Sequence, residues 1–299
     1  MDSVKEKVNS AIRKLKQPGL KRQMFLANAG GIAFYWVVGT VIYTMTMLVA
    51  LPTLYADNPP GMSFHRIVLS FLWASMMINY MLSIRKTSYY EAARSNANTN
   101  AESASKGWAY CTPCQQYMPP RCRHCPVCDR CILKRDSHCF FTGHCIGHRN
   151  QRYFLVFVFY TAFGGLYSFI CLAAATGSLL GTPLSMNGDI FNYLYPFATG
   201  KWLSGYMAGK AFALLSCMYM CTTITVGCFG LFGYHFRHVL KGQTSYEAEK
   251  SITKYRHTTL RNVEDVFSRF SIMCFLLPIP FALPSNGITW NQCKEVKGY

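Results

Sequence analysis

Long apolar blocks alternate with polar, basic segments along this chain of 299 residues. Four of the blocks contain no charged residue, and they cover residues 31–51, 67–83, 153–180 and 211–234. A helix crosses the hydrocarbon core of a bilayer with ~20 apolar residues, within a range of roughly 17 to 25. A helix buried in a soluble protein is the alternative for each block, and it is strongest for 67–83 because that block is the shortest. The pattern predicts an all-α integral membrane protein with four transmembrane helices.

A fifth apolar run, residues 271–283, is shorter and contains Pro278 and Pro280. Proline removes a backbone donor and breaks a helix. We expect this run to lie at the membrane interface or to pack on the helices rather than to cross the bilayer.

The distribution of Lys and Arg predicts the orientation. Seven of these residues lie in 1–23, eleven in 84–152 and nine in 235–299, whereas 52–66 and 181–210 contain one and two. Loops rich in Lys and Arg stay in the cytosol, so both termini and the segment between the second and third spans are expected there. The N-terminal segment is too polar for a cleavable signal peptide, and the first span is expected to serve as an uncleaved anchor.

The formal net charge of +17 is also compatible with a protein that binds nucleic acid. The basic residues follow the cytosolic ends of the predicted spans, however, where anionic lipid headgroups attract them. We therefore expect membrane lipid as a partner and no nucleic acid. A channel or transporter is not favoured, because such proteins place ionisable groups inside their spans and the four blocks have no charged residue.

Cysteine and histidine are concentrated in one cytosolic segment, which contains eight cysteines and three histidines between Cys111 and Cys145. Cysteines separated by two residues bring two thiolates to one zinc ion, and four such ligands close a tetrahedral site. Two zinc ions would use eight ligands and leave one thiol free, with Cys122 and His144 outside the pattern. Because the cytosol keeps thiols reduced, the segment is predicted to bind metal or to carry catalysis rather than to form disulfides.

Three runs in this segment follow a known order: Pro119-Pro-Arg-Cys-Arg-His-Cys125-x-x-Cys128-x-x-Cys131, then Asp136-Ser-His-Cys139, then Cys145-Ile-Gly-His-Arg-Asn150-Gln-Arg-Tyr-Phe154. They resemble the DHHC family of protein S-acyltransferases. Farther along, Thr244-Ser-Tyr-Glu247 resembles the Thr-Thr-x-Glu motif of that family, and Tyr255, Asn262 and Phe267 match the spacing of its C-terminal motif. The resemblance covers most of the chain from the first span to about residue 270.

The resemblance implies two structural zinc ions. One site would use Cys111, Cys114, His124 and Cys131, and the other would use Cys125, Cys128, His138 and Cys145. The remaining thiol, Cys139, would carry an acyl group, with Asp136 positioning the catalytic loop. Such a palmitoyltransferase takes palmitoyl or another long-chain acyl group from acyl-CoA and passes it to cysteines of protein substrates near the membrane. Palmitate on Cys139 would make the chain itself a lipoprotein.

Ser137 departs from the family at the position of its catalytic histidine. A serine cannot act as a base near neutral pH, and losing a general base costs about two to four orders of magnitude in rate. Three interpretations remain open. The base is supplied by His144 or His148, or a preformed thiolate at Cys139 is acylated slowly without a base, or the chain is a catalytically impaired relative that acts as a zinc-dependent membrane scaffold.

Two phenylalanines, Phe140 and Phe141, replace the Pro-Trp pair that follows the nucleophile in the family, so the fixed turn of the proline is lost. Both side chains remain apolar and can contact the acyl chain or the headgroup region. By similarity, the Ser245 hydroxyl is predicted to hydrogen-bond Asp136, and Asn262 is predicted to cap a nearby helix end.

Charge gives two further expectations. Zinc, together with Lys134 and Arg135, is expected to favour the thiolate of Cys139. The phosphates of coenzyme A need cationic partners at the cytosolic surface, and the candidates are Arg149, Arg152, Arg237 and Lys241.

The acyl chain is expected to enter a cavity among the four helices, since each methylene that leaves water contributes ~0.8 kcal/mol. Residues of the third span at helical spacing either line that cavity or pack against neighbouring helices. They are Phe157, Tyr160, Phe163 and Gly164.

The predicted organisation has five parts. These are a cytosolic basic segment (1–30), transmembrane helices 1 and 2 (31–84), a cytosolic linker with the zinc-binding domain (85–152), transmembrane helices 3 and 4 with a luminal loop (153–234), and a cytosolic C-terminal region (235–299). An enzyme of this family is expected in the endomembrane system, in the Golgi, the endoplasmic reticulum or the plasma membrane.

Overall fold

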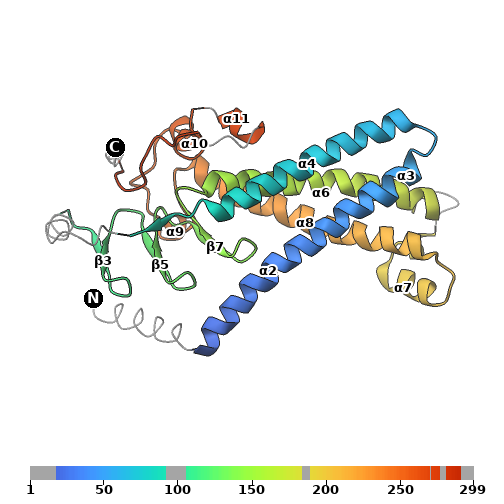
Figure 1. The fold of residues 1–299 in the computed structure, drawn as a ribbon, viewed down its shortest axis with the longest axis horizontal. Helices are drawn as coiled ribbons and strands as arrows, with labels where there is room; N and C mark the ends of the chain where they lie inside the picture. The colour runs from blue at the N-terminus through green and yellow to red at the C-terminus, as the bar shows by residue number, and fades with distance from the viewer. Residues whose placement is uncertain (1–17, 92–105, 184–188, 270, 277–280, 291–299) are drawn as a thin grey trace, which may run out of the picture. The chain divides into compact units, whose positions relative to one another are not determined.

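The computed structural model describes residues 18–91, 106–183, 189–269, 271–276 and 281–290 (Figure 1). Parts of the predicted N-terminal basic segment and of the linker before the zinc-binding region lie outside these residues. The chain divides into two compact units, which are described separately. The first comprises Met1–Phe34, Asn79–Val156 and Tyr234–Tyr299, and the second comprises Tyr35–Ile78 and Phe157–Gly233.

Four long helices confirm the predicted spans, since each is long and apolar enough to cross a membrane. The first runs through α2 (Pro18–Met45), the π-helical turn η1 (Thr46–Ala50) and α3 (Leu51–Leu54), and the others are α4 (Pro59–Arg85), α6 (Gln151–Leu180) and α8 (Gly209–Leu240). At 1.5 Å per residue, the 32 residues of α8 measure ~48 Å, whereas the hydrocarbon core of a bilayer is ~30 Å thick. The helices therefore extend beyond the apolar blocks that predicted them.

Local sequence explains where two of these helices begin and end. Asn58 caps the start of α4, because its Oδ1 accepts a hydrogen bond from the backbone N–H of Gly61 at 3.0 Å. Pro59 follows at the first position of that helix, where its missing N–H has no helical partner to lose. At the other end of the chain, α8 stops at Leu240, and Gly242 adopts φ +64°, a left-handed conformation that costs glycine little.

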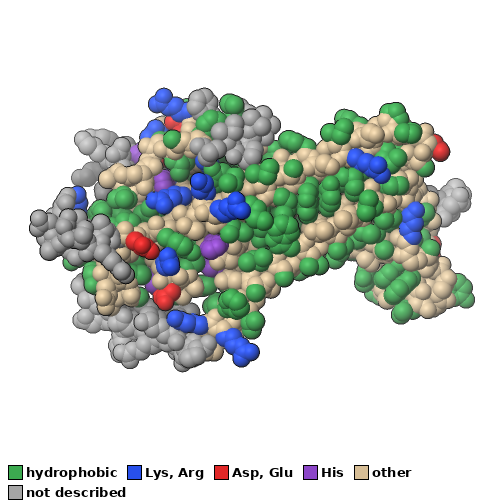
Figure 2. All heavy atoms as spheres, in the orientation of Figure 1, with side chains coloured by type: hydrophobic (Ala, Val, Ile, Leu, Met, Phe, Trp, Pro, Cys, Tyr) green, Lys and Arg blue, Asp and Glu red, His purple; other side chains and the backbone are tan. Residues whose placement is uncertain are grey.

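The second unit is built from segments of the four long helices, and hydrophobic side chains cover them on the face shown in Figure 2. Rings from neighbouring helices contact one another in this unit. Phe157 contacts Tyr35 edge-on with 5.3 Å between ring centroids, and Tyr160 contacts Phe71 at 6.1 Å. Phe163 likewise contacts Phe229 at 5.3 Å. These contacts agree with the helix-packing interpretation of the third span. The fully buried core includes Ala50, Leu172, Ala175, Leu214 and Cys221.

The connection between α6 and α8 contains a 3-10 turn, η2 (Ile190–Asn192), and a short helix, α7 (Tyr195–Leu203). Ala198 of α7 packs with Ala211 and Leu215 of α8 in a small buried cluster. Trp202 stacks on Phe212 with parallel rings 4.6 Å apart. This loop is therefore folded against the helix that follows it.

The first unit contains short antiparallel strands. They are β1 (Tyr89–Tyr90), β2 (Ala109–Cys111), β3 (Gln116–Met118), β4 (Arg123–Cys125), β5 (Arg130–Ile132), β6 (Ser137–Cys139) and β7 (His144–Ile146). They form a three-stranded sheet in the order β1-β5-β4 and the hairpins β2-β3 and β6-β7. Strands of two or three residues cannot enclose a large apolar core, and small domains of this kind depend on metal ions or disulfides.

Three short helices follow α8: α9 (Ser245–Glu249), α10 (Thr259–Phe267) and α11 (Ser271–Leu276). The fifth apolar run contributes the six residues of α11, which is far shorter than a span. Its two central prolines lie outside the described residues. The expectation that this run does not form a continuous transmembrane helix agrees with α11.

Candidate active site

Two groups of four side chains can each hold one metal ion, and they are the two sets that the resemblance implied. In each set, the ligand atoms all lie within 4.8 Å of one another; the sets are Cys111, Cys114, His124 and Cys131, and Cys125, Cys128, His138 and Cys145. Three thiolates and one imidazole form a closed ligand set typical of structural zinc. The donor chemistry of both sets therefore fits zinc.

Distances in the second set agree with a tetrahedron. The Nδ1 atom of His138 lies 3.8, 3.4 and 3.7 Å from the sulfurs of Cys125, Cys128 and Cys145, and the last two sulfurs are 3.7 Å apart. Zinc–sulfur bonds of about 2.3 Å place two tetrahedral ligands about 3.8 Å apart. These four residues are thus arranged for one zinc ion without rearrangement.

The two sites interlock because successive side chains of a strand point to opposite faces. On β4, His124 belongs to the first set and the adjacent Cys125 to the second. Cys131 on β5 pairs directly with His124, and cross-strand partners share one face. A single short sheet therefore connects both metal sites.

Tight turns complete the two cysteine pairs. Gln115 follows Cys114 and Asp129 follows Cys128, and both adopt φ +53°. A positive φ is uncommon for residues other than glycine. Its occurrence at the same position in both pairs shows that each hairpin turn is shaped so that its two thiolates converge.

Cys139 belongs to neither ligand set. It follows His138 on β6. In the pairing of β6 with β7, His138 lies opposite Cys145, and Cys139 lies opposite His144. His138 and Cys145 face the metal site, so alternation along the strands directs Cys139 and His144 to the opposite face. The free thiol is thus kept away from the second metal site by the geometry of its own strand.

The loop after Cys139 is held by hydrogen bonds. The backbone N–H and hydroxyl of Thr142 both donate to the Cys139 carbonyl, at 3.3 and 3.2 Å. The Tyr80 hydroxyl donates to the Phe141 carbonyl at 2.9 Å. Burial raises the pKa of the Cys139 thiol, and hydrogen bonds from Thr142 and Phe141 offset only part of that effect.

The two cations expected to favour the thiolate have other partners. The Lys134 ammonium lies 5.6 Å from the centroid of the Trp290 ring, and Arg135 donates to the Cys125 sulfur at 3.9 Å. Lys134 is buried, and burial, followed by the charge of Arg121, lowers its pKa to about 7. These contacts give neither cation a role at Cys139.

Asp136 is a buried carboxylate with several donors around it. One oxygen, Oδ2, lies 2.9 Å from Nδ1 of His235 and accepts from the Ser137 hydroxyl at 3.4 Å. The other accepts from the backbone N–H and the hydroxyl of Ser245 at 2.7 and 3.1 Å. Burial alone raises the pKa of Asp136, but His235 and then Ser245 outweigh it, so the pKa lies below its ordinary value. The predicted contact between Ser245 and Asp136 is confirmed.

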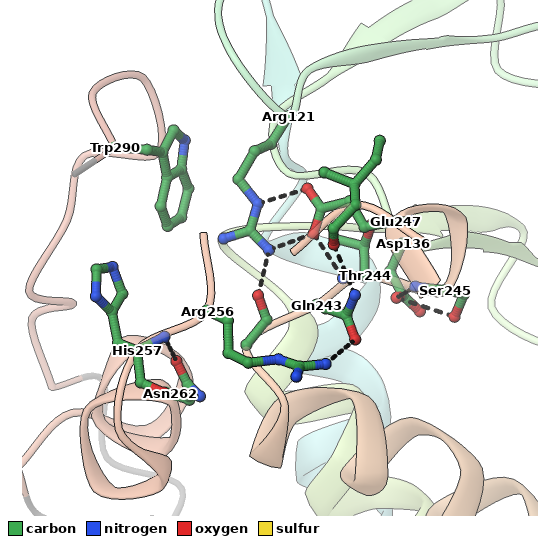
Figure 3. A network of polar contacts seen from close by, with 12 residues as sticks. Arg121, Asp136, Gln243, Thr244, Ser245, Glu247, Arg256, His257, Asn262 and Trp290 are labelled. Atoms are coloured by element: carbon green, nitrogen blue, oxygen red, sulfur yellow. Dashed lines mark hydrogen bonds and ion pairs between the residues drawn. The ribbon is translucent and has the colours of Figure 1, made fainter. Parts of the chain in front are cut away.

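The motif that contains Ser245 is fastened to the cysteine-rich segment by a buried ion pair (Figure 3). Arg121 donates from Nε and Nη2 to the two carboxylate oxygens of Glu247, at 2.8 and 2.7 Å. Glu247 also accepts from the backbone N–H of Thr244, whose hydroxyl accepts from the N–H of Glu247 in return. This capping box starts α9. The motif therefore does two things: Thr244 and Glu247 start a helix, and Ser245 binds Asp136.

Asn262 caps the end of α8, as predicted, because its Nδ2 donates to the Leu240 carbonyl at 2.9 Å. Its Oδ1 accepts from the backbone N–H of His257 at 3.1 Å (Figure 3). A Cβ on Gly242 would lie 2.5 Å from that oxygen. Asn262 and Gly242 thus fix the chain where α8 ends and the Ser245 motif begins.

The two histidines considered as replacement bases differ in position. His144 is the cross-strand partner of Cys139, and its Nδ1 lies 3.1 Å from the Tyr89 hydroxyl. His148 is buried, donates from Nε2 to the Ser285 carbonyl at 3.0 Å and meets the Trp290 ring edge-on. Burial lowers the pKa of His148 to about 4. His148 serves the packing of the C-terminal segment, whereas His144 lies opposite the thiol.

The four candidates for contact with coenzyme A also divide into two kinds. Arg149, Arg237 and Lys241 are exposed. Arg152 is buried, donates to the Phe281 carbonyl at 2.7 Å and lies over the Tyr153 ring at 4.5 Å. Three of the four cations are therefore free to meet an anion from solvent.

Sequence reasoning missed His235, Arg121 and Asn28 as parts of the site. His235 contacts Asp136, Arg121 contacts Glu247, and Asn28 contacts His138 through its Oδ1, at 3.0 Å from Nε2. The partners are 110 residues apart in the case of Asn28 and 126 in that of Arg121. No spacing rule connects such distant positions. For Asn28 and His235 the only signal was a polar residue beside an apolar block, and for Arg121 it was a place in the run Pro119-Pro-Arg-Cys.

The fold and the site together define a class: a helical membrane protein with two interlocked zinc-binding sets and a half-buried thiol, Cys139, that lies outside both sets on a hairpin carrying two of the ligands. Comparison with known proteins specifies the family. The profile of the DHHC palmitoyltransferase family matches residues 104–252. Palmitoyltransferase ZDHHC22 of Danio rerio is 30% identical over 287 residues, which cover 90% of this chain and 98% of that protein.

Two further relatives agree with this match. Palmitoyltransferase ZDHHC22 of Homo sapiens is 28% identical, with 85% of this chain and 93% of the relative covered. The probable palmitoyltransferase ZDHHC24 of Danio rerio is 32% identical, with 66% of each chain covered. The chain belongs to the DHHC palmitoyltransferase family.

Proposed function

We propose that this chain is a protein S-palmitoyltransferase whose acyl carrier is Cys139. The observation that supports this role most directly is the position of Cys139 in the hairpin β6-β7, outside two complete ligand sets. A thiol that binds no metal, beside thiols that do, is available as a nucleophile. Zinc would be held by the eight ligands and would keep the three hairpins in register, while Cys139 carries out the chemistry.

The reaction proceeds in two exchanges of a thioester. The Cys139 sulfur attacks the carbonyl carbon of acyl-CoA, the bond from that carbon to the CoA sulfur breaks, and the CoA thiol leaves with a proton. A cysteine of a protein substrate then attacks the acyl-enzyme, and the Cys139 thiol is released. Each step forms one thioester as it breaks another, so the main requirements are an ionised sulfur and its alignment.

The proton of Cys139 has one candidate acceptor on the face of its hairpin. Residues directly opposite on antiparallel strands have Cβ atoms about 4.5–5.5 Å apart, and His144 occupies that position. In the tautomer whose Nδ1–H donates to the Tyr89 hydroxyl oxygen, Nε2 carries no hydrogen and can accept the proton. We assign His144 the task that the histidine at the position of Ser137 has in the family.

Asp136 is proposed to hold the catalytic hairpin in place rather than to take part in proton transfer. Its two oxygens are bound by His235, Ser245 and Ser137, and its backbone N–H donates to the Ile146 carbonyl on β7 at 2.9 Å. The residue thereby links the start of β6 to the end of α8 and to α9. We propose that this link fixes the position of the hairpin that carries Cys139 relative to the end of α8 and to α9.

The substrates follow from this chemistry. The acyl donor is palmitoyl-CoA or another long-chain acyl-CoA, whose phosphates meet Arg149, Arg237 and Lys241. Arg152 was a fourth candidate, and its present hydrogen bonds favour a structural task. The acceptors are cysteines of proteins close to the membrane. In this proposal the protein resides in an endomembrane, and the zinc region and both termini lie on the cytosolic side of that membrane.

A catalytically impaired scaffold is the second candidate, and one observation favours it: Ser137 provides no base beside Asp136. The two functions differ in one measurable product. An acyltransferase forms a thioester at Cys139 that hydroxylamine cleaves, whereas a scaffold binds zinc and partners without that thioester.

Labelling with radioactive palmitoyl-CoA tests the proposal on the purified full chain. The unaltered protein is expected to gain a hydroxylamine-sensitive label, and Cys139→Ser is expected to lose it. Cys228→Ser is the matched control, because Cys228 is also a half-buried thiol outside both ligand sets. Equal labelling of Cys139→Ser and the control would remove Cys139 from the mechanism, and absence of label in the unaltered protein would favour the scaffold.

A further inference from the structure

One face of the cytosolic third of α2 lies against the loop that carries Cys139. Along this stretch, Met24, Asn28, Gly31 and Ile32 are half-buried, while the residues between them are exposed. Positions separated by three and four residues share one side of a helix. The half-buried stripe is therefore a continuous contact surface, and all of it belongs to the first unit.

Asn28 contacts the residue before the nucleophile. Its Oδ1 lies 3.0 Å from Nε2 of His138, whose Nδ1 faces the second metal site. An amide oxygen accepts, so Nε2–H is the donor, and the ring presents Nδ1 to the metal. A partner on the far nitrogen fixes both the tautomer and the orientation of a ligating histidine. Asn28 is thus an orienting residue for the ligand that precedes Cys139.

Gly31 contacts the residue after the nucleophile. A Cβ built on Gly31 would lie 2.8 Å from the carbonyl oxygen and 3.0 Å from the carbonyl carbon of Phe140. The obstacle is backbone, which cannot swing away as a side chain can. The neighbouring Gly30 differs, because a Cβ there would meet nothing within 4 Å. Of these two glycines on α2, it is Gly31 that permits the close approach of helix and loop.

Two apolar contacts extend the surface along the loop. A Cβ on Gly143 would lie 3.1 Å from Cδ1 of Ile32, and the ring of Phe34 lies 6.4 Å from that of Phe141. Gly143 adopts φ +67°, so the turn and the contact both suit glycine. The helix thus touches the loop before, just after and farther beyond Cys139.

We propose that Asn28, Gly31 and Ile32 form a positioning surface that sets the placement of Cys139 for acyl transfer. The family fixes this loop with a proline, and here Phe140 stands in that place. The contacts with α2, together with the hydrogen bond from Tyr80 to Phe141, supply the missing constraint. The inference rests on the proposed function and adds to it a role for the first transmembrane helix.

The size of the expected effect follows from the demands of alignment. A displacement of 1 Å at a reacting atom can reduce a rate by about 100-fold. A Cβ at 2.8 Å from a backbone oxygen forces a shift of several tenths of an ångström, because contacts under 3.0 Å do not persist. We therefore expect a moderate loss of rate from a single methyl group at Gly31.

The adjacent glycines give a matched pair of variants. Gly31→Ala and Gly30→Ala add the same methyl group to the same helix and raise helix propensity equally. At saturating palmitoyl-CoA, Gly31→Ala is expected to form acyl-enzyme about 10-fold more slowly than the unaltered protein. Gly30→Ala is expected to stay within about twofold, and the half-saturating concentration is expected to be unchanged in both. Equal rates for the two variants would overturn the inference.

Alkylation by iodoacetamide separates this inference from the proposed function. If the unaltered protein forms no acyl-enzyme, the proposed function fails, while mass spectrometry still measures alkylation at each cysteine. Gly31→Ala is expected to change the rate at Cys139 by about threefold or more relative to Gly30→Ala, with no change at Cys217 or Cys228. Equal rates at Cys139, or a parallel change at all three cysteines, would overturn the positioning surface.

Asn28 allows a second test with rescue. Asn28→Ala removes the acceptor, whereas Asn28→Asp retains an oxygen at the same place. We expect the alanine variant to alter the visible absorption of the Co²⁺-substituted protein, since His138 loses its orienting partner, and the aspartate variant to restore it. An unchanged spectrum in Asn28→Ala would exclude an orienting role.

Discussion

The side chain of His235, at the end of α8, lies 2.9 Å from Asp136 through its Nδ1 and the carboxylate Oδ2, and both residues are buried. This contact links the fourth long helix to the strand that carries the nucleophile. In a chain where Ser137 stands beside Asp136, His235 supplies the carboxylate with its imidazole partner.

His235→Ala is expected to destabilise the protein by about 2–4 kcal/mol, because removing one partner leaves a buried carboxylate short of a donor. His235→Asn places an amide N–H near the position of Nδ1 and is expected to recover most of that loss. Thermal unfolding in detergent measures both. Equal melting temperatures for the two variants would contradict a hydrogen-bonding role for Nδ1.

The base assignment predicts opposite effects for two substitutions. His144→Ala is expected to slow acyl-enzyme formation by about 100-fold, which is the lower end of the loss of a general base. Ser137→His is expected to speed it, because an imidazole then stands beside Asp136 as in the family. Single-turnover labelling with palmitoyl-CoA measures both rates. If neither variant changes the rate, acylation proceeds without a base on the enzyme.

The ion pair of Arg121 and Glu247 predicts a large stability effect. Both side chains are almost fully buried, and the guanidinium also lies over the rings of Tyr255 and Trp290 at 5.0 and 4.6 Å. Arg121→Ala is expected to cost about 3–5 kcal/mol, because it leaves Glu247 buried and unpaired. Arg130→Ala is the control, since Arg130 forms an exposed pair with Glu91 that is worth at most about 1 kcal/mol. Similar melting temperatures would show that the buried pair contributes little.

Lys134 predicts a pH dependence of stability. Its pKa falls from 10.5 to about 7 in the folded chain. Between pH 7 and 10.5 the unfolded chain therefore holds more protons at this side chain, and stability rises with pH at up to about 1.4 kcal/mol per unit. Lys134→Met is expected to lack that rise. Melting curves of both proteins at pH 7.5 and 9.5 check the difference, and parallel shifts would place the pKa of Lys134 near its ordinary value.

Zinc content distinguishes ligands from bystanders. Cys122 and Cys131 are both buried in the same small cluster, but only Cys131 belongs to a ligand set. Cys131→Ala is expected to reduce bound zinc from two ions per chain to one or none, because three ligands hold zinc weakly. Cys122→Ala is expected to retain both ions. Metal analysis by mass spectrometry gives the ratio, and loss of zinc from the Cys122 variant would revise the ligand set.

Sequence alone predicted the parts of this protein that depend on local pattern. The four spans follow from length and hydropathy, and the metal-binding sets follow from cysteine spacing and the family resemblance, because the ligands come from one stretch of chain. The contact between Ser245 and Asp136 was also predictable, since a family motif contains each of them.

The parts that sequence did not predict depend on packing between distant segments. Asn28 and His138 are 110 residues apart, and nothing in the composition of α2 distinguishes the asparagine from other polar residues near the start of a span. The same holds for the difference between Gly30 and Gly31, which depends only on which side of α2 faces the loop. Likewise, the exposure of Lys134 could not be judged before the position of Trp290 was known.

The order of the metal ligands along the chain bears on how this protein is made. Its first ligand set is complete once Cys131 has emerged from the ribosome, and its second is complete at Cys145, before α6 begins at Gln151. Both zinc ions can therefore be captured before the third and fourth helices have left the ribosome. A cell short of zinc would then stall maturation at an early stage, with the first two helices already inserted and the nascent thiols unprotected against oxidation.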